Sequence, residues 1–178
     1  MKSLVVYYSR TGNNKYLAQK IASDTGSDII ELKPLGNSFF SIIISSLFKT
    51  PIPLQKISAD IASYDKVILC GPIYMGQLIS PLSSFIKKYR SSISKLHFIT
   101  CCGGGEEEKD GKFGYNSVFA KVRKTAGELC KSCDAFPIDL IVPDELRGND
   151  QAIMNIRLSS ENFSGAIVEK YNEYIQKI

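Results

Sequence analysis

The chain has 178 residues, of which 44% are hydrophobic and 22% are charged, and its formal net charge is +4. This length and composition argue against a disordered protein and predict one globular domain over residues 1–178. The positive charge is mild and spread along the sequence, so it does not indicate a nucleic-acid partner.

In the first half of the chain, short apolar runs alternate with a helical pattern. Strands are expected over Ser3–Tyr8, Ile29–Lys33 and Lys66–Cys70. Between the first two strands, apolar residues recur at the spacing of one helix face: Leu17, Ala18, Ile21 and Ala22.

The second half continues the alternation. The dipeptide Ser80-Pro81 is expected to supply an N-cap and a first-turn proline, and a fourth strand is expected over Lys95–Thr100. Asn116 or Ser117 is expected to cap the next helix, and Phe136–Val142 is expected to be the fifth strand. The last helix carries an apolar stripe formed by Phe163, Ile167, Tyr171, Tyr174 and Ile178.

Alternating strands and helices predict an α/β fold with a parallel sheet and helices on both faces. Short continuous apolar strands are typical of parallel strands that are buried on both sides. Such sheets bind ligands beyond the carboxyl ends of their strands. The loops that follow the first, third and fourth strands are therefore the candidate site.

The first loop, Ser9-Arg10-Thr11-Gly12-Asn13-Asn14, joins a buried strand to a helix N-terminus. Free backbone N–H groups and the helix dipole favour an anion at this position. Ser9, Thr11 and Asn14 add polar side chains, and Gly12 allows the backbone to approach a ligand closely. A phosphate site and a capped turn without a ligand are both open. Neither the Gly-Lys-Ser/Thr nucleotide loop nor the three-glycine dinucleotide fingerprint is present.

Two further loops follow the third and fourth strands. In Gly71-Pro72-Ile73-Tyr74-Met75-Gly76, a flat ring could stack on Tyr74, or Tyr74 and Met75 could simply cover the end of the sheet. In Thr100-Cys101-Cys102-Gly103-Gly104-Gly105, the glycines either bare the backbone for edge-on hydrogen bonds to a heterocycle or form a flexible connection. Together the three loops offer a phosphate cradle, an aromatic platform and a bare backbone edge, which fits flavin mononucleotide (FMN).

On these residues the chain resembles the flavodoxin family over nearly its whole length. The first loop is similar to the family's phosphate-binding signature, although Asn14 stands where Ser or Thr is usual. The other two loops, with Gly114-Tyr115, are similar to the loops around the flavin ring. The resemblance implies a doubly wound five-stranded parallel sheet in the order 2-1-3-4-5. It implies FMN contacts from Ser9, Arg10, Thr11, Gly12, Asn13, Asn14, Pro72, Ile73, Tyr74, Met75, Gly76, Cys101, Cys102, Gly103, Gly104, Gly105 and Tyr115.

Two features depart from the family's usual electron carriers. Those carriers are strongly acidic, whereas this chain has a pI of about 8.7. Trp is absent, so stacking would fall to Tyr74 or Tyr115. We expect an FMN protein that transfers electrons with a redox partner protein or a small-molecule donor or acceptor. The alternatives are an FMN-dependent NAD(P)H or quinone oxidoreductase, and a flavodoxin-like interaction module without flavin.

Other conspicuous features are predicted to be structural. Cys130-Lys131-Ser132-Cys133 has a redox-type spacing, but it is expected at a helix C-terminus, where the dipole does not lower a thiol pKa. His97 is expected to pack within its strand, and Glu106–Glu108 to lie on a solvated loop. Ser38–Phe48 is expected to form a helix buried on the sheet, with a membrane or quinone contact as the alternative. No metal site or catalytic side chain is predicted.

The cysteine count and the apolar runs also bear on location. Five cysteines, an odd number, are more typical of free thiols than of a disulfide framework. The first strand starts directly after Met1, which leaves no room for a secretory signal. No apolar run approaches the roughly 20 residues of a membrane-spanning helix. We therefore expect a cytoplasmic protein without stable membrane insertion.

Overall fold

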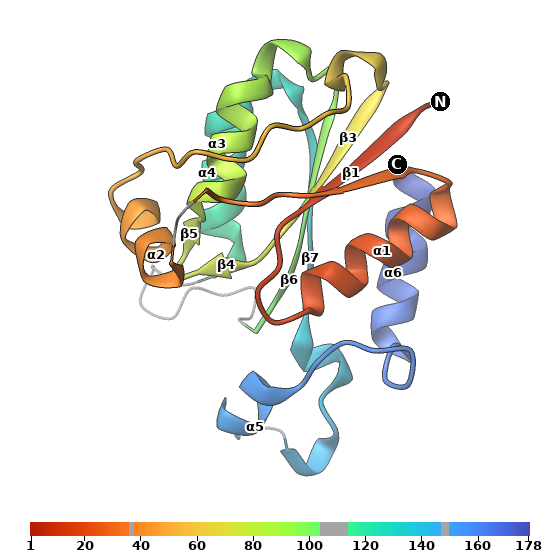
Figure 1. Cartoon of the computed structure of the whole chain (residues 1–178). Helices are drawn as coiled ribbons and strands as arrows, with labels where there is room; N and C mark the ends of the chain where they lie inside the picture. Colours follow the sequence, from red (N-terminus) through yellow and green to blue (C-terminus); the bar gives the residue numbers. More distant parts are fainter. Residues whose placement is uncertain (36–37, 104–113, 147–149) are drawn as a thin grey trace.

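The apolar runs form one parallel sheet in the strand order β2-β1-β3-β6-β7 (Figure 1). The computed structural model describes residues 1–35, 38–103, 114–146 and 150–178. The sheet contains β1 (Ser3–Tyr7), β2 (Asp28–Glu31), β3 (Lys66–Cys70), β6 (Leu96–Cys102) and β7 (Cys130–Pro137). A separate antiparallel hairpin, β4 (Ile73–Tyr74) and β5 (Gln77–Leu78), follows β3. With the hairpin set aside, the order is the predicted 2-1-3-4-5, so the flavodoxin-like fold is confirmed.

Helices cover both faces of the sheet, as predicted. In Figure 1, α1 (Asn13–Thr25) and α6 (Ala166–Lys177) lie on one side, and α3 (Ser80–Tyr89) and α4 (Tyr115–Ala126) lie on the other. The smaller helix α2 (Phe39–Leu47) lies beside α3 and β5. Beyond the carboxyl end of β7, the chain forms short 3-10 turns and α5 (Asp150–Asn155).

The strands are apolar throughout because both of their faces are covered. Every residue of β1, β3 and β6 is buried. Successive side chains of a strand point to opposite faces. In β1, Leu4 and Val6 therefore join the core on the α3–α4 side, whereas Val5 and Tyr7 join the core on the α1–α6 side.

The fifth strand differs from the prediction. It begins at Cys130, and the predicted run Phe136–Val142 supplies only its last two residues before a 3-10 turn over Ile138–Ile141. The first part of β7 is only partly buried because β7 is an edge strand, so it tolerates polar residues that obscure a strand pattern. α4 ends at Ala126, so the Cys130–Cys133 segment lies in a strand and not at a helix C-terminus.

The predicted N-caps were wrong by one residue for α3 and by two or three residues for α4. Ile79 is the N-cap of α3, and Ser80 is the first helical residue, with its hydroxyl 2.9 Å from the Ser45 hydroxyl of α2. Gly114 precedes α4, so Asn116 and Ser117 lie inside the first turn. The Ser80 N–H and hydroxyl instead bond to Ser46 and Ser45 of α2, and the Ser117 hydroxyl donates to the Gly114 carbonyl.

The segment Ser38–Phe48 does form a helix, with Ser38 as its N-cap, but its expected burial on the sheet was wrong. Within α2 the buried residues are Ile42 and Ser46, while Phe40 and the following Phe48 are 72% and 78% exposed. The reason is position: α2 packs against α3 and β5 at the end of the sheet and not against its face. Among the described residues, no helix combines the length and the apolar character needed to cross a membrane.

Replacing Gly71 with Ala is expected to lower the free energy of unfolding by about 1–3 kcal/mol, because it overpacks a closed site. A Cβ at Gly71 would lie 2.7 Å from a methyl group of Leu82, whose side chain is fully buried on α3. Urea denaturation of the flavin-free protein would measure the effect. Gly103→Ala is the matched control, because a Cβ there meets nothing within 4 Å. Equal midpoints for the two variants would contradict this packing argument.

Candidate functional site

The first loop leaves an open helix N-terminus. Gly12 is the N-cap of α1, with φ of 99°, a conformation that favours glycine. The Gly12 N–H donates to Ser9 Oγ at 3.2 Å, and Thr11 is exposed. Within the described part of the chain, no side chain caps α1, and its first turn holds no acidic residue. The first-turn N–H groups are therefore available to an anion.

Asn14 holds this loop against the end of β6. Its Nδ2 donates to the Cys101 carbonyl at 3.0 Å, and its Oδ1 accepts from the Cys101 N–H at 2.8 Å. The sequence suggested that this amide would donate to a phosphate, but the structure gives the side chain a bracing role. The first and third predicted loops are thus joined by two buried hydrogen bonds.

Asn13 makes a second connection of this kind. Its Oδ1 accepts from the backbone N–H of Leu158 at 3.0 Å, across a sequence separation of 145 residues. Leu158 is buried among the residues on the α1–α6 side. This bond brings the segment before it, including Ile156 and Arg157, to the first loop.

The second predicted loop is a tight hairpin. Met75 and Gly76 connect β4 to β5 with φ of 50° and 65°, which is the sign pattern of a type I′ turn. The Lys121 ammonium group on α4 donates to the Gly76 carbonyl. This hydrogen bond connects the hairpin to α4. The Met75 side chain is exposed.

Tyr74 lies in a cluster of aromatic and basic side chains. Its ring meets Phe39 of α2 edge-on, with the centroids 5.4 Å apart, and the Arg10 guanidinium carbon lies 3.5 Å from the Phe39 centroid. Burial and the nearby Tyr8 raise the pKa of the Tyr74 phenol, so the ring stays neutral at physiological pH. Phe39 therefore helps to orient the Tyr74 ring. No local pattern in the sequence indicated this role for Phe39.

The three loops line one cleft of about 400 Å³. Eleven of the predicted site residues line it: Thr11, Asn13, Asn14, Pro72, Ile73, Tyr74, Met75, Gly76, Cys101, Cys102 and Gly103. The remaining wall was missed from the sequence and consists of Ile138, Met154, Ile156 and Arg157. The cleft therefore joins polar groups at the α1 N-terminus to an aromatic and apolar section.

Other predicted residues lie elsewhere. Ser9, Arg10 and Gly12 support the loop without lining the cleft. Tyr115, the alternative stacking residue, is buried in the core with its ring centroid 5.3 Å from that of Phe119. Gly104–Gly105 and Glu106–Glu108 lie outside the described residues. Tyr74 is consequently the tyrosine that faces the cleft.

Two of the buried thiols, Cys70 and Cys101, and the histidine of the sheet are not poised for catalysis. Burial raises the pKa of the Cys70 thiol and of the Cys101 thiol, which disfavours their reactive thiolates. Burial and the nearby Lys66 lower the pKa of His97, whose Nδ1 lies 3.1 Å from Ser132 Oγ within the sheet, as a packed strand residue would. In the described ranges, no group of three metal-ligating side chains occurs.

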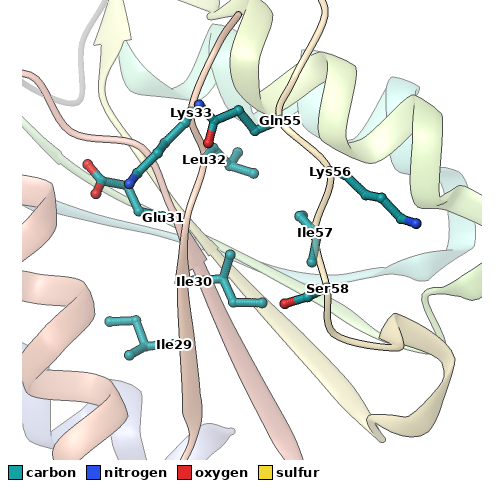
Figure 2. Close-up of a pocket in the computed structure, with 9 residues that line it drawn as sticks. All are labelled: Ile29, Ile30, Glu31, Leu32, Lys33, Gln55, Lys56, Ile57 and Ser58. Atoms are coloured by element: carbon teal, nitrogen blue, oxygen red, sulfur yellow. The ribbon is translucent and has the colours of Figure 1, made fainter.

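A second hollow of about 300 Å³ lies at the β2 edge of the sheet (Figure 2). It lies between the residues around β2 and the segment 55–58. The Gln55 N–H donates a hydrogen bond to the Lys33 carbonyl at 2.9 Å, which connects the two. Figure 2 shows Lys56 pointing away from Glu31, so the charged groups do not converge. The polar groups instead converge in the cleft between the three loops.

Comparisons with known proteins agree with this geometry. A family model described as a flavodoxin domain matches residues 50–137. An uncharacterised protein of Archaeoglobus fulgidus is 25% identical over 115 residues, which cover 65% of this chain and 74% of that protein. The flavodoxin-family resemblance noted from the sequence is confirmed.

Solved structures share the fold. A flavoprotein of Lactobacillus acidophilus in complex with FMN has a TM-score of 0.60 and 17% identity, covering 75% of this chain and 92% of its own. A flavodoxin of Streptococcus pneumoniae TIGR4 has a TM-score of 0.50 and 13% identity, covering 100% of both chains. At these identities the likeness shows a common architecture.

Proposed function

We propose that this chain, whose fold is flavodoxin-like and whose residues 50–137 match a flavodoxin-domain model, binds FMN in the cleft and transfers electrons. The observation that supports this most strongly is the open N-terminus of α1. It adjoins the same cleft as the Tyr74 hairpin, so one ligand with a terminal phosphate and a flat ring satisfies both.

The first loop fits the phosphate. Gly12 has a positive φ and a Cβ there would meet nothing within 4 Å, so the loop has room beside it. The exposed Thr11 adds a hydroxyl to the N–H groups of the helix. Arg157, which also lines the cleft, adds a positive charge to it. A dianion is stabilised by this combination of donors and charge.

The section of the cleft between the hairpin and the end of β6 fits the ring. Tyr74 supplies an aromatic face, and Ile156 and Met154 supply apolar contacts. The backbone at Cys102 and Gly103 also lines the cleft, where it can meet the polar edge of a heterocycle. When bound, FMN supplies the redox chemistry, and the residues of the chain bind, orient and shield it.

Absorption spectroscopy and flavin titration test this proposal. Apoprotein should quench the fluorescence of added FMN at a stoichiometry of one, and stepwise reduction of the complex would separate one-electron from two-electron transfer. NAD(P)H or a quinone that reacts directly with the complex would favour an oxidoreductase over a carrier. A purified, folded protein that neither carries nor takes up FMN would contradict the proposal.

Replacing Tyr74 with Ala is expected to weaken FMN roughly 2- to 13-fold, because an aromatic contact of about 0.5–1.5 kcal/mol beyond its buried area is lost. The negative face of the tyrosine ring disfavours the more electron-rich reduced flavin, so the loss should be greater for oxidised FMN and should raise the midpoint potential. Fluorescence titration and potentiometry measure both effects. Tyr74→Phe keeps the ring and should retain parental affinity. Parental affinity and quenching in Tyr74→Ala would remove Tyr74 from the ring site.

A further inference from the structure

Cys130 and Cys133 lie together at the start of the edge strand β7. In a regular strand, residues three apart point to opposite faces. Here the register shifts: Cys130 is opposite Leu96, Ser132 is opposite His97 and Cys133 is opposite Phe98. Lys131 is therefore the extra residue of a β-bulge. The bulge returns both thiols to the face that carries Leu96 and Phe98.

The two sulfur atoms are in contact. Their Sγ atoms are 3.5 Å apart, so a disulfide would require them to approach by roughly 1.5 Å. Both side chains are partly buried against the α3–α4 core and partly open to solvent, whereas the other three cysteines, Cys70, Cys101 and Cys102, are buried. The bulged pair is thus the accessible thiol site of the described structure.

The surroundings of the pair favour one thiolate. The hydrogen bond with Cys133 is the main cause that lowers the pKa of Cys130 to about 7, and the positive charges of Arg123 and Lys131 act in the same direction against burial. The same hydrogen bond raises the pKa of Cys133. With the two sulfur atoms in contact, these charges make Cys130 the expected nucleophile and Cys133 the expected resolving thiol, without help from a helix dipole.

We propose that Cys130 and Cys133 form a redox-active dithiol that a hydroperoxide converts into a reversible disulfide. The Cys130 thiolate attacks the peroxide, the O–O bond breaks and an S–O bond forms. Cys130 becomes a sulfenic acid, and the peroxide is reduced to an alcohol or water with a proton from solvent. The Cys133 sulfur then attacks the Cys130 sulfur, so the S–S bond forms and the S–O bond breaks. The oxygen leaves as water with the Cys133 proton, and a dithiol reductant restores both thiols by exchange.

This dithiol is separate from the cleft. Cys130 is opposite Leu96 at the start of β6, whereas Cys101 at the end of β6 borders the cleft. Five residues of strand separate these positions, which is roughly 16 Å. Oxidation of the pair is therefore a second redox event. The proposal for the dithiol does not depend on FMN binding.

Peptide mapping tests the proposal directly. The folded protein is treated with stoichiometric hydrogen peroxide, unfolded in iodoacetamide and digested with trypsin. Because trypsin cleaves after Lys131, a Cys130–Cys133 disulfide would join two separate peptides, and dithiothreitol would release them. Alkylatable thiols should fall from the five of the sequence by two, leaving Cys70, Cys101 and Cys102 modified.

Two single variants assign the roles. In Cys133→Ser, peroxide should leave a sulfenic acid at Cys130 that dimedone traps, whereas Cys130→Ser should trap none at Cys133. Without peroxide, Cys130 should react with iodoacetamide at least ~10-fold faster than the buried cysteines. A linked peptide that appears only after unfolding, or oxidation spread equally over all five thiols, would overturn the proposal.

Discussion

Asn14→Ala is expected to lower the free energy of unfolding by about 2–4 kcal/mol, because it leaves a buried N–H and a buried carbonyl of Cys101 without their partners. The same change releases the first loop from the end of β6, so FMN affinity should fall as well. Urea denaturation of the apoprotein measures the first effect, and fluorescence titration of the folded variant measures the second.

Lys15→Ala is the matched control for Asn14→Ala. Lys15 is the next residue of α1, but its side chain is exposed. Surface substitutions of this kind usually change stability by less than about 0.5 kcal/mol. If both variants unfold at the same urea concentration, the two bonds to Cys101 do not hold the loops together in the way proposed.

Thr11→Val is expected to weaken FMN roughly 10- to 150-fold while leaving the fold intact. It removes a hydroxyl donor to a charged acceptor, which contributes about 1.5–3 kcal/mol. The Thr11 side chain is exposed at the mouth of the cleft, so the apoprotein should keep its stability. Titration of the variant and the parent with FMN gives the ratio of dissociation constants.

Two companion variants sharpen the Thr11 experiment. Thr11→Ser keeps the hydroxyl and should bind FMN nearly as the parent does. Thr25→Val removes a hydroxyl at the opposite end of α1, where it donates to the Ile21 carbonyl at 2.6 Å, and should leave FMN affinity unchanged. An equal loss in Thr11→Val and Thr25→Val would point to damage to the helix and not to a phosphate contact.

The strand ends made most of the cleft predictable. The predicted strand Lys66–Cys70 has the observed bounds of β3. Its residues 67–70 form a short continuous apolar run, which is typical of a parallel strand buried on both faces. Parallel strands end at the same edge, so the loops after β1, β3 and β6 were expected to meet there. The cleft brings their residues together.

The remaining wall of the cleft could not be predicted in this way. Ile156 and Arg157 reach the cleft through a long-range bond between Asn13 and Leu158, and no periodic pattern reports such a contact. The bulge in β7 was hidden for a related reason. Register depends on the partner strand, so the contact between Cys130 and Cys133 becomes visible only when β7 is paired with β6.

A direct comparison of FMN, riboflavin and FAD binding to the same apoprotein tests the central claim most directly. The three ligands share the isoalloxazine ring, but only FMN ends in a phosphate that the open N-terminus of α1 can accept. The cleft described above predicts that FMN binds with the lowest dissociation constant, at least ~10-fold below that of riboflavin, because one or more charge-assisted hydrogen bonds are gained. Equal affinity for FMN and riboflavin would contradict the assignment of the first loop as a phosphate site.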